Sequence, residues 1–176
     1  MIKISGNAIK HIDRSDARYK TLVDVHSRLA KKDSSIWGAA AQAEASVRLN
    51  WIDLPESSRD LLPALDALCA KHRDKNNVVL CGMGGSSLGP EVIAQSFKEE
   101  LFILDSTDPD YVAHALNNDL AKTVVIISSK SGSTIETASQ RALFEDAFTQ
   151  VGLAPQNHMV IVTDPGSPLD KQSRAH

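Results

Sequence analysis

The chain has 176 residues, of which 42% are hydrophobic and 23% charged, and its formal net charge is -3. This length fits roughly one domain of about 100 to 200 residues, and the chain has no basic stripe to neutralise phosphates along a strand, which argues against a nucleic-acid partner. No apolar run reaches the roughly 20 residues of a membrane-spanning helix, and MIKISGNAIK at the start lacks the apolar region of a signal peptide. We therefore expect a cytoplasmic protein with no membrane partner. Cys69 and Cys81 have no CxxC spacing and are predicted to be reduced core or near-core residues, and no metal or cofactor is expected.

The N-terminal part, residues 1–56, is predicted to be a helical segment. Apolar residues recur at helical spacing over residues 12–30, and the stretch GAAAQAEASVRL has strong helix propensity, which predicts a second short helix ending near Trp51. Residues 53–58, DLPESS, are typical of a turn. We place the start of an α/β domain, residues 57–176, there.

The rest of the chain alternates short apolar runs with helical patterns. Strands are predicted at residues 78–81, 101–104, 124–127 and 159–162. The first run is continuous rather than alternating, which indicates burial on both faces, as in a parallel sheet. Strands separated by helices are typical of βαβ units, so we expect a three-layer α/β fold of flavodoxin or Rossmann type, with helices on both faces of a parallel sheet. Ligands of such sheets bind beyond the carboxyl ends of the strands.

Three helix beginnings are predicted from residues that favour helix N-termini. Pro90 follows a glycine turn and is favoured at the first helical position. Asp108, which precedes a proline, is a typical N-cap. Ser133 and Glu136 have the spacing of a capping box, which predicts a helix beginning at Thr134.

Two loops of small residues follow predicted strands. The first, GMGGSSLGP at residues 82–90, has glycines that permit positive φ and close backbone approach, and it leads into a helix N-terminus, which favours an anion. The second, SSKSGST at residues 128–134, places five hydroxyls, a glycine and a lysine before another helix. Alone, the second loop could be a serine-rich turn that only caps its helix. Two such loops at one sheet edge favour a phosphorylated ligand.

Nucleotide-binding motifs fit the first loop poorly. A GxGxxG motif that begins at Gly82 has Ser87 in place of its third glycine, and a P-loop would need a lysine directly after Gly89. A nucleotide-binding domain of a dehydrogenase is therefore the weaker alternative. The pattern favours a phosphate site without a magnesium-binding residue.

Both loops resemble motifs of the glucose-6-phosphate isomerase family. GMGGSSLGP is similar to that family's first phosphate-loop motif and SSKSGSTIET to its second, both within the SIS (sugar isomerase) fold. LDSTDPD and VTDPGSPLD also resemble the bacterial branch in which the isomerase is sometimes fused behind a transaldolase. The resemblance runs from about Trp37 to the C-terminus, and it implies an N-terminal fragment of such an isomerase, with the SIS domain truncated at its C-terminus.

The resemblance also implies which residues bind the phosphate of the sugar. They are Gly85 and Ser86 in the first loop and Ser129, Lys130, Ser131, Gly132, Ser133 and Thr134 in the second. Ser131 and Gly132 stand where the family commonly has Thr-Phe. Serine keeps the hydroxyl, whereas the loss of the aromatic residue predicts altered local packing and is also seen in generic SIS sugar-phosphate binders.

The family's reaction is the interconversion of glucose 6-phosphate and fructose 6-phosphate, a step of glycolysis and gluconeogenesis. A histidine assists ring opening and a glutamate moves a proton between C1 and C2 through an enediolate. The resemblance places those residues in the family's second half, and Glu136 is interpreted as a helix cap, so we expect no catalytic residue in this chain and no activity from it alone. The full-length protein is expected to be a homodimer. A non-catalytic SIS module that senses a sugar phosphate is the alternative.

Overall fold

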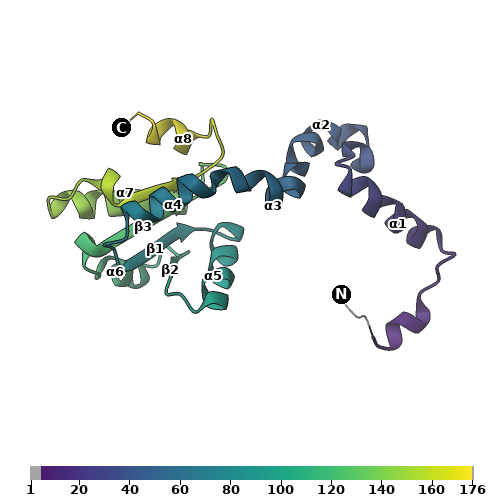
Figure 1. The fold of residues 1–176 in the computed structure, drawn as a ribbon, viewed down its shortest axis with the longest axis horizontal. Coiled ribbons are helices and arrows are strands. Elements are labelled where there is room, and N and C mark those ends of the chain that lie inside the picture. The colour runs from purple at the N-terminus through teal and green to yellow at the C-terminus, as the bar shows by residue number, and fades with distance from the viewer. Residues whose placement is uncertain (1–4, 176) are drawn as a thin grey trace. The chain divides into compact units, whose positions relative to one another are not determined.

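The computed structural model describes residues 5–175 and divides the chain into two compact units, one ending at Asp66 and one beginning at Ala67. The first unit contains α1 (Ala17–Ala30), α2 (Ala39–Arg48) and α3 (Leu54–Ser57), joined by short 3-10 turns, and α4 (Leu62–Lys71) crosses from the first unit into the second (Figure 1). The sequence placed the boundary after residue 56, earlier in the same helical run. That division of the chain stays a prediction.

Two local predictions for the first unit need correction. The helix predicted over residues 12–30 is present and ends at Ala30, but it begins at Ala17, because the Asp16 carboxylate accepts a hydrogen bond from the Arg18 amide and caps the helix there. The DLPESS segment is the short helix α3 rather than a turn. Pro55 lies in its first turn, where a missing N–H removes no intrahelical hydrogen bond.

The second unit is built on four parallel strands. They are β1 (Asn77–Gly82), β2 (Phe102–Leu104), β3 (Thr123–Ser128) and β4 (Met159–Val162), in the order β2-β1-β3-β4. Each neighbouring pair is parallel. The predicted parallel sheet is confirmed, and each strand matches its predicted bounds to within one residue at either end.

Helices α5 (Gly85–Phe97), α6 (Pro109–Leu116), α7 (Ile135–Gln150) and α8 (Pro168–Ser173) belong to the same unit (Figure 1). The β1-to-β2 connection runs across the sheet in the direction opposite to the β2-to-β3 and β3-to-β4 connections. Right-handed crossovers therefore place α5 on one face and α6 and α7 together on the other, and α6 indeed contacts α7. The prediction of helices on both faces is confirmed, as is Asp108 as the N-cap of α6.

The core of this unit lies between the sheet and α7. Fully buried side chains from both include Val79, Cys81, Leu104, Val125, Ile127, Phe144 and Phe148. Cys81 is free and fully buried, which confirms it as a reduced core residue, and burial raises the pKa of its thiol to about 12. The same prediction is wrong for Cys69, which is exposed, because helical spacing alone does not show which side of α4 is covered. Among residues 5–175, no helix is long and apolar enough to cross a membrane.

His72, which follows α4, should make the stability of this unit depend on pH. Both ring nitrogens are buried and have no hydrogen-bond partner among the described residues. Burial, together with the charges of Lys71 and Lys75, lowers the pKa of His72 below its usual 6.5. As the pH falls, His72 is therefore protonated in the unfolded chain at a higher pH than in the folded chain. The stability that neutral His72 contributes is complete above pH 6.5 and is lost as the pH falls through the lower folded pKa.

Urea unfolding measured from about pH 8 down to about pH 5 checks this expectation, since an ordinary histidine titrates within that window. His72→Gln, which cannot take up the proton, should reduce the loss of stability on the acid side. An equal loss in the variant and the unaltered chain would contradict the assignment.

Candidate functional site

The two small-residue loops lie side by side at the carboxyl edge of the sheet. β1 ends at Gly82 and β3 ends at Ser128, and these two residues are register partners on neighbouring strands. The chain leaves β1 toward β2 and leaves β3 toward β4, so the connections diverge between β1 and β3. A doubly wound sheet has its ligand crevice at this topological switch point.

Gly82, the first glycine of the first loop, allows the backbone of that loop to lie close to the end of β3. A side-chain carbon at Gly82 would lie 3.1 Å from the Ser86 carbonyl oxygen and 3.2 Å from the Ser128 carbonyl oxygen. Both are backbone atoms and cannot rotate away. The turn after β1 therefore lies directly against the end of β3.

The first loop enters α5 earlier than predicted. Gly84, with φ +58, is the N-cap, so Gly85 and Ser86 occupy the first turn of α5. Pro90 lies inside the helix, and the prediction that it begins the helix is wrong, because glycines and serines give no apolar pattern from which the first turn could be recognised. A proline at this position removes one hydrogen bond of the helix, because Pro90 has no N–H to donate to the Ser86 carbonyl. The Ser86 hydroxyl makes no hydrogen bond within the part of the chain that the structure describes.

In the second loop the hydroxyls form two clusters. Ser129 is buried, its Oγ donates to Thr134 Oγ1 over 3.2 Å, and the Gly132 amide donates to Ser129 Oγ over 3.2 Å. Ser131 Oγ accepts from both the amide and the hydroxyl of Ser133, over 3.3 and 3.1 Å. The predicted residues of this loop, apart from the exposed Lys130, are thus bonded to one another.

The predicted capping box at the start of α7 does not form. The helix begins at Ile135 with Thr134 as N-cap, and no side chain caps it. The reason is that the Ser133 hydroxyl is turned toward Ser131 and the Thr134 hydroxyl toward Ser129. Glu136 is therefore not a cap. The amides of the first turn of α7 have no side-chain acceptor and remain available to an anion.

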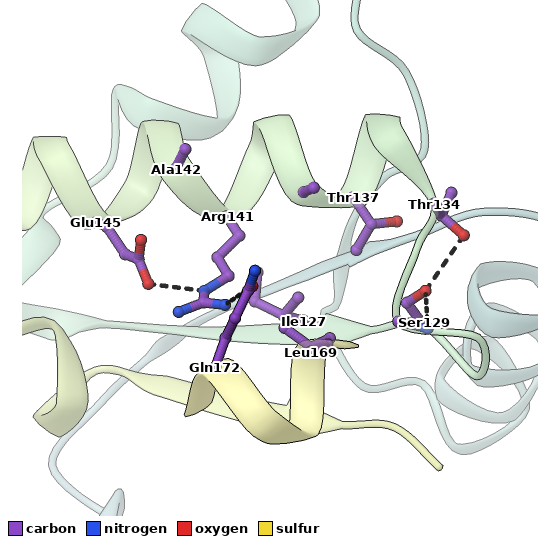
Figure 2. Close-up of a pocket in the computed structure, with 11 residues that line it drawn as sticks. Ile127, Ser129, Thr134, Thr137, Arg141, Ala142, Glu145, Leu169 and Gln172 are labelled. Carbon is purple, nitrogen blue, oxygen red and sulfur yellow. Dashed lines mark hydrogen bonds and ion pairs between the residues drawn. The ribbon is translucent and has the colours of Figure 1, made fainter. Parts of the chain in front are cut away.

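A cavity of about 350 Å³ opens beside this loop between α7 and α8 (Figure 2). Its walls include Ser129, Gly132, Thr134, Thr137, Arg141 and Gln172. Only three of the eight predicted site residues line it. The other five, which are Gly85, Ser86, Lys130, Ser131 and Ser133, lie outside its lining, so the structure does not bring all eight around this one cavity.

Two polar side chains of this cavity were missed from the sequence. Thr137 is 1% exposed and its hydroxyl has no hydrogen-bond partner among the described residues. Its position three residues after Thr134, on the same side of a helix, is the signal that could have found it. Arg141 pairs with Glu145 at 2.7 Å and donates to Gln172 at 3.1 Å across to α8 (Figure 2). No pattern in the sequence links Arg141 to residue 172.

A model of the phosphoglucose isomerase family matches residues 67–167, more than half of the chain. The chain belongs to the phosphoglucose isomerase family. It is 30% identical to a glucose-6-phosphate isomerase of Chlamydia felis over 97% of its own length, and 38% identical to that of Chlamydia trachomatis serovar A over 56%. The predicted family is thereby confirmed.

Two solved structures share the fold of this chain, and one of them is of a glucose-6-phosphate isomerase. A glucose-6-phosphate isomerase from Chlamydia trachomatis superposes with a TM-score of 0.61 at 34% identity, covering 67% of this chain and 24% of that one. A hypothetical protein from Thermus thermophilus superposes with a TM-score of 0.71 at 29% identity, covering 90% and 38%. The chain spans about a third of the length of the curated relatives it matches, 31% for the Chlamydia felis isomerase.

Proposed function

We propose that this chain is the sugar-phosphate-binding portion of a glucose-6-phosphate isomerase, which interconverts glucose 6-phosphate and fructose 6-phosphate through an enediolate. The observation that carries the proposal is the pairing of Gly82 with Ser128, because it joins the two loops that carry the family's motifs at the switch point of the sheet. An anion at that point would face the first turns of both α5 and α7.

The eight residues that the motifs indicate remain our proposed phosphate site. Ser129 and Thr134 would supply hydroxyls, and the uncapped first turn of α7 would supply amides. The Gly85 amide and the Ser86 hydroxyl would approach from the first loop. Exposed Lys130 would add positive charge at the rim. The Ser131 and Ser133 hydroxyls and the Gly132 amide complete the set.

The catalytic histidine and glutamate are proposed to lie outside this chain, in the part of the relatives that it does not span. A homodimeric, cytoplasmic full-length enzyme that binds no nucleic acid also stays a proposal. The alternative, a sensor of sugar phosphates, would use the same phosphate site without the reaction.

Removal of one site hydroxyl should weaken the binding of fructose 6-phosphate. We expect Ser129→Ala to raise the dissociation constant about 5- to 150-fold, because a hydrogen bond to a charged group contributes roughly 1 to 3 kcal/mol. Titration calorimetry or NMR titration of the chain measures the effect. Ser139→Ala is a matched control, since Ser139 lies on α7, beyond the second loop, and its hydroxyl bonds only the Ile135 carbonyl. Equal affinities of the two variants would remove Ser129 from the site.

A further inference from the structure

Hydrogen bonds join the second loop to the segment between β4 and α8, residues 163–167. Thr163 Oγ1 donates to the Ser129 carbonyl oxygen over 2.7 Å and lies 2.8 Å from Ser167 Oγ. The Asp164 amide donates to the Lys130 carbonyl over 3.2 Å. Thirty-four residues separate Ser129 from Thr163, so this attachment is tertiary and is invisible in either motif alone.

The direction of these hydrogen bonds follows from the number of protons. Thr163 has one hydroxyl proton, and it goes to the Ser129 carbonyl, so the Ser167 hydroxyl must donate to Thr163. Ser167 Oγ in turn accepts from the Asp170 amide over 3.0 Å as the N-cap of α8. A directed chain of hydrogen bonds therefore runs from α8 through Ser167 and Thr163 to the backbone of the second loop.

Ser129 makes hydrogen bonds through its carbonyl, its amide and its hydroxyl. Its carbonyl accepts hydrogen bonds from the Thr163 hydroxyl and, over 3.1 Å, from the Gly132 amide. Its amide donates to the Val162 carbonyl over 3.0 Å. Its hydroxyl donates to Thr134 and accepts from the Gly132 amide. A rotation of the Ser129 peptide unit would move the hydroxyl cluster and the start of α7 together. The Gly132 amide belongs to the same loop, so Thr163 is the donor that ties the Ser129 carbonyl to another segment of the fold.

We propose that Thr163 is a positioning residue of the phosphate site, which holds the second loop in its binding conformation before the ligand arrives. This inference rests on the proposed function and extends it to a residue that is not itself among the phosphate contacts. A loop that is already ordered loses less conformational entropy on binding than one that must be ordered by the ligand.

The experiment compares three variants of the whole chain. Thr163→Val keeps the shape and removes the hydroxyl, and Thr163→Ser keeps the hydroxyl. Thr123→Val is the matched control: Thr123 Oγ1 also donates to a backbone carbonyl over 2.7 Å, that of Asp119, but at the amino end of β3, away from both loops. Two quantities are measured for each: the affinity for fructose 6-phosphate, and the amide hydrogen exchange of residues 129–134 without ligand.

We expect Thr163→Val to weaken binding about 5- to 30-fold, the cost of ordering roughly one residue, and to accelerate exchange in the loop. Thr163→Ser should restore both. Thr123→Val should lower the resistance to urea without changing either quantity. Unchanged affinity or unchanged loop exchange in Thr163→Val would overturn the positioning role, as would an equal loss of affinity in Thr123→Val. If the unaltered chain binds no fructose 6-phosphate, the proposed function itself fails and the positioning role fails with it.

Discussion

Replacement of Gly132 by alanine should lower the free energy of unfolding of the α/β unit by about 2 to 5 kcal/mol, because the left-handed backbone conformation costs an alanine roughly 1 to 2 kcal/mol and overpacking costs roughly 1 to 3 kcal/mol. Gly132 has φ +65, a conformation that disfavours any side chain. An added side-chain carbon would also lie 2.6 Å from Ser167 Oγ and 2.9 Å from the Leu169 amide nitrogen. Urea unfolding measures the loss.

Gly152→Ala separates the two causes. Gly152 has φ +76, but no atom lies within 4 Å of its added carbon, so this variant should lose only the conformational part, about 1 to 2 kcal/mol. Equal losses in the two variants would show that the second loop does not lie against Ser167 and Leu169. In this chain the space beside Gly132 is filled by Ser167 and Leu169 at the start of α8.

The second large effect concerns catalysis. The chain alone should bind fructose 6-phosphate and show no isomerisation above the uncatalysed rate, whereas an enzyme typically accelerates its reaction about 10⁶-fold or more. An anchored phosphate binds substrate and transition state equally, and equal binding does not lower the chemical barrier. A coupled assay that detects glucose 6-phosphate measures turnover, with the Chlamydia felis isomerase as the positive control.

Glu136 is the residue that could contradict this expectation. It lies in the first turn of α7, beside the proposed phosphate site, and the structure gives it no capping role. Turnover by the purified chain that Glu136→Gln abolishes would make Glu136 catalytic and refute the separation of binding from chemistry. Binding without turnover, lost in Ser129→Ala, would agree with it.

The strands could be predicted from the sequence because burial on both faces of a parallel sheet leaves continuous apolar runs. Helix beginnings were harder where no apolar residue marks the first turn. The prediction of Asp108 as an N-cap was correct because its carboxylate accepts hydrogen bonds from the amides two and three residues later, which is a purely local interaction. The predicted capping box of Ser133 and Glu136 failed because the Ser133 hydroxyl donates to the Ser131 hydroxyl instead of capping the helix.

Only the part of the site that the two motifs form could be predicted from the sequence. The glycine and serine loops indicated an anion at the sheet edge, and parallel pairing placed them together. A third segment, from Thr163 to Ser167, contributes to the site through tertiary hydrogen bonds to the second loop. The buried hydroxyl of Thr137 can be recognised only when the packing of α7 is known. Neither follows from composition or spacing, because both depend on which distant elements the fold brings beside the loop.

The two thiols of the chain would react with an alkylating reagent on different timescales. Cys69 is exposed and should be labelled first. Cys81 is buried in β1 between β2 and β3, and its raised pKa leaves almost no thiolate at neutral pH. Its labelling must wait until the centre of the sheet opens. Cys81 directly precedes the glycine turn of the proposed site. A ligand that binds only the folded sheet would slow the labelling of Cys81, and more so as a larger fraction of the chain is bound. The labelling rate of this one native cysteine can therefore report both the local opening of the sheet and the binding of ligand.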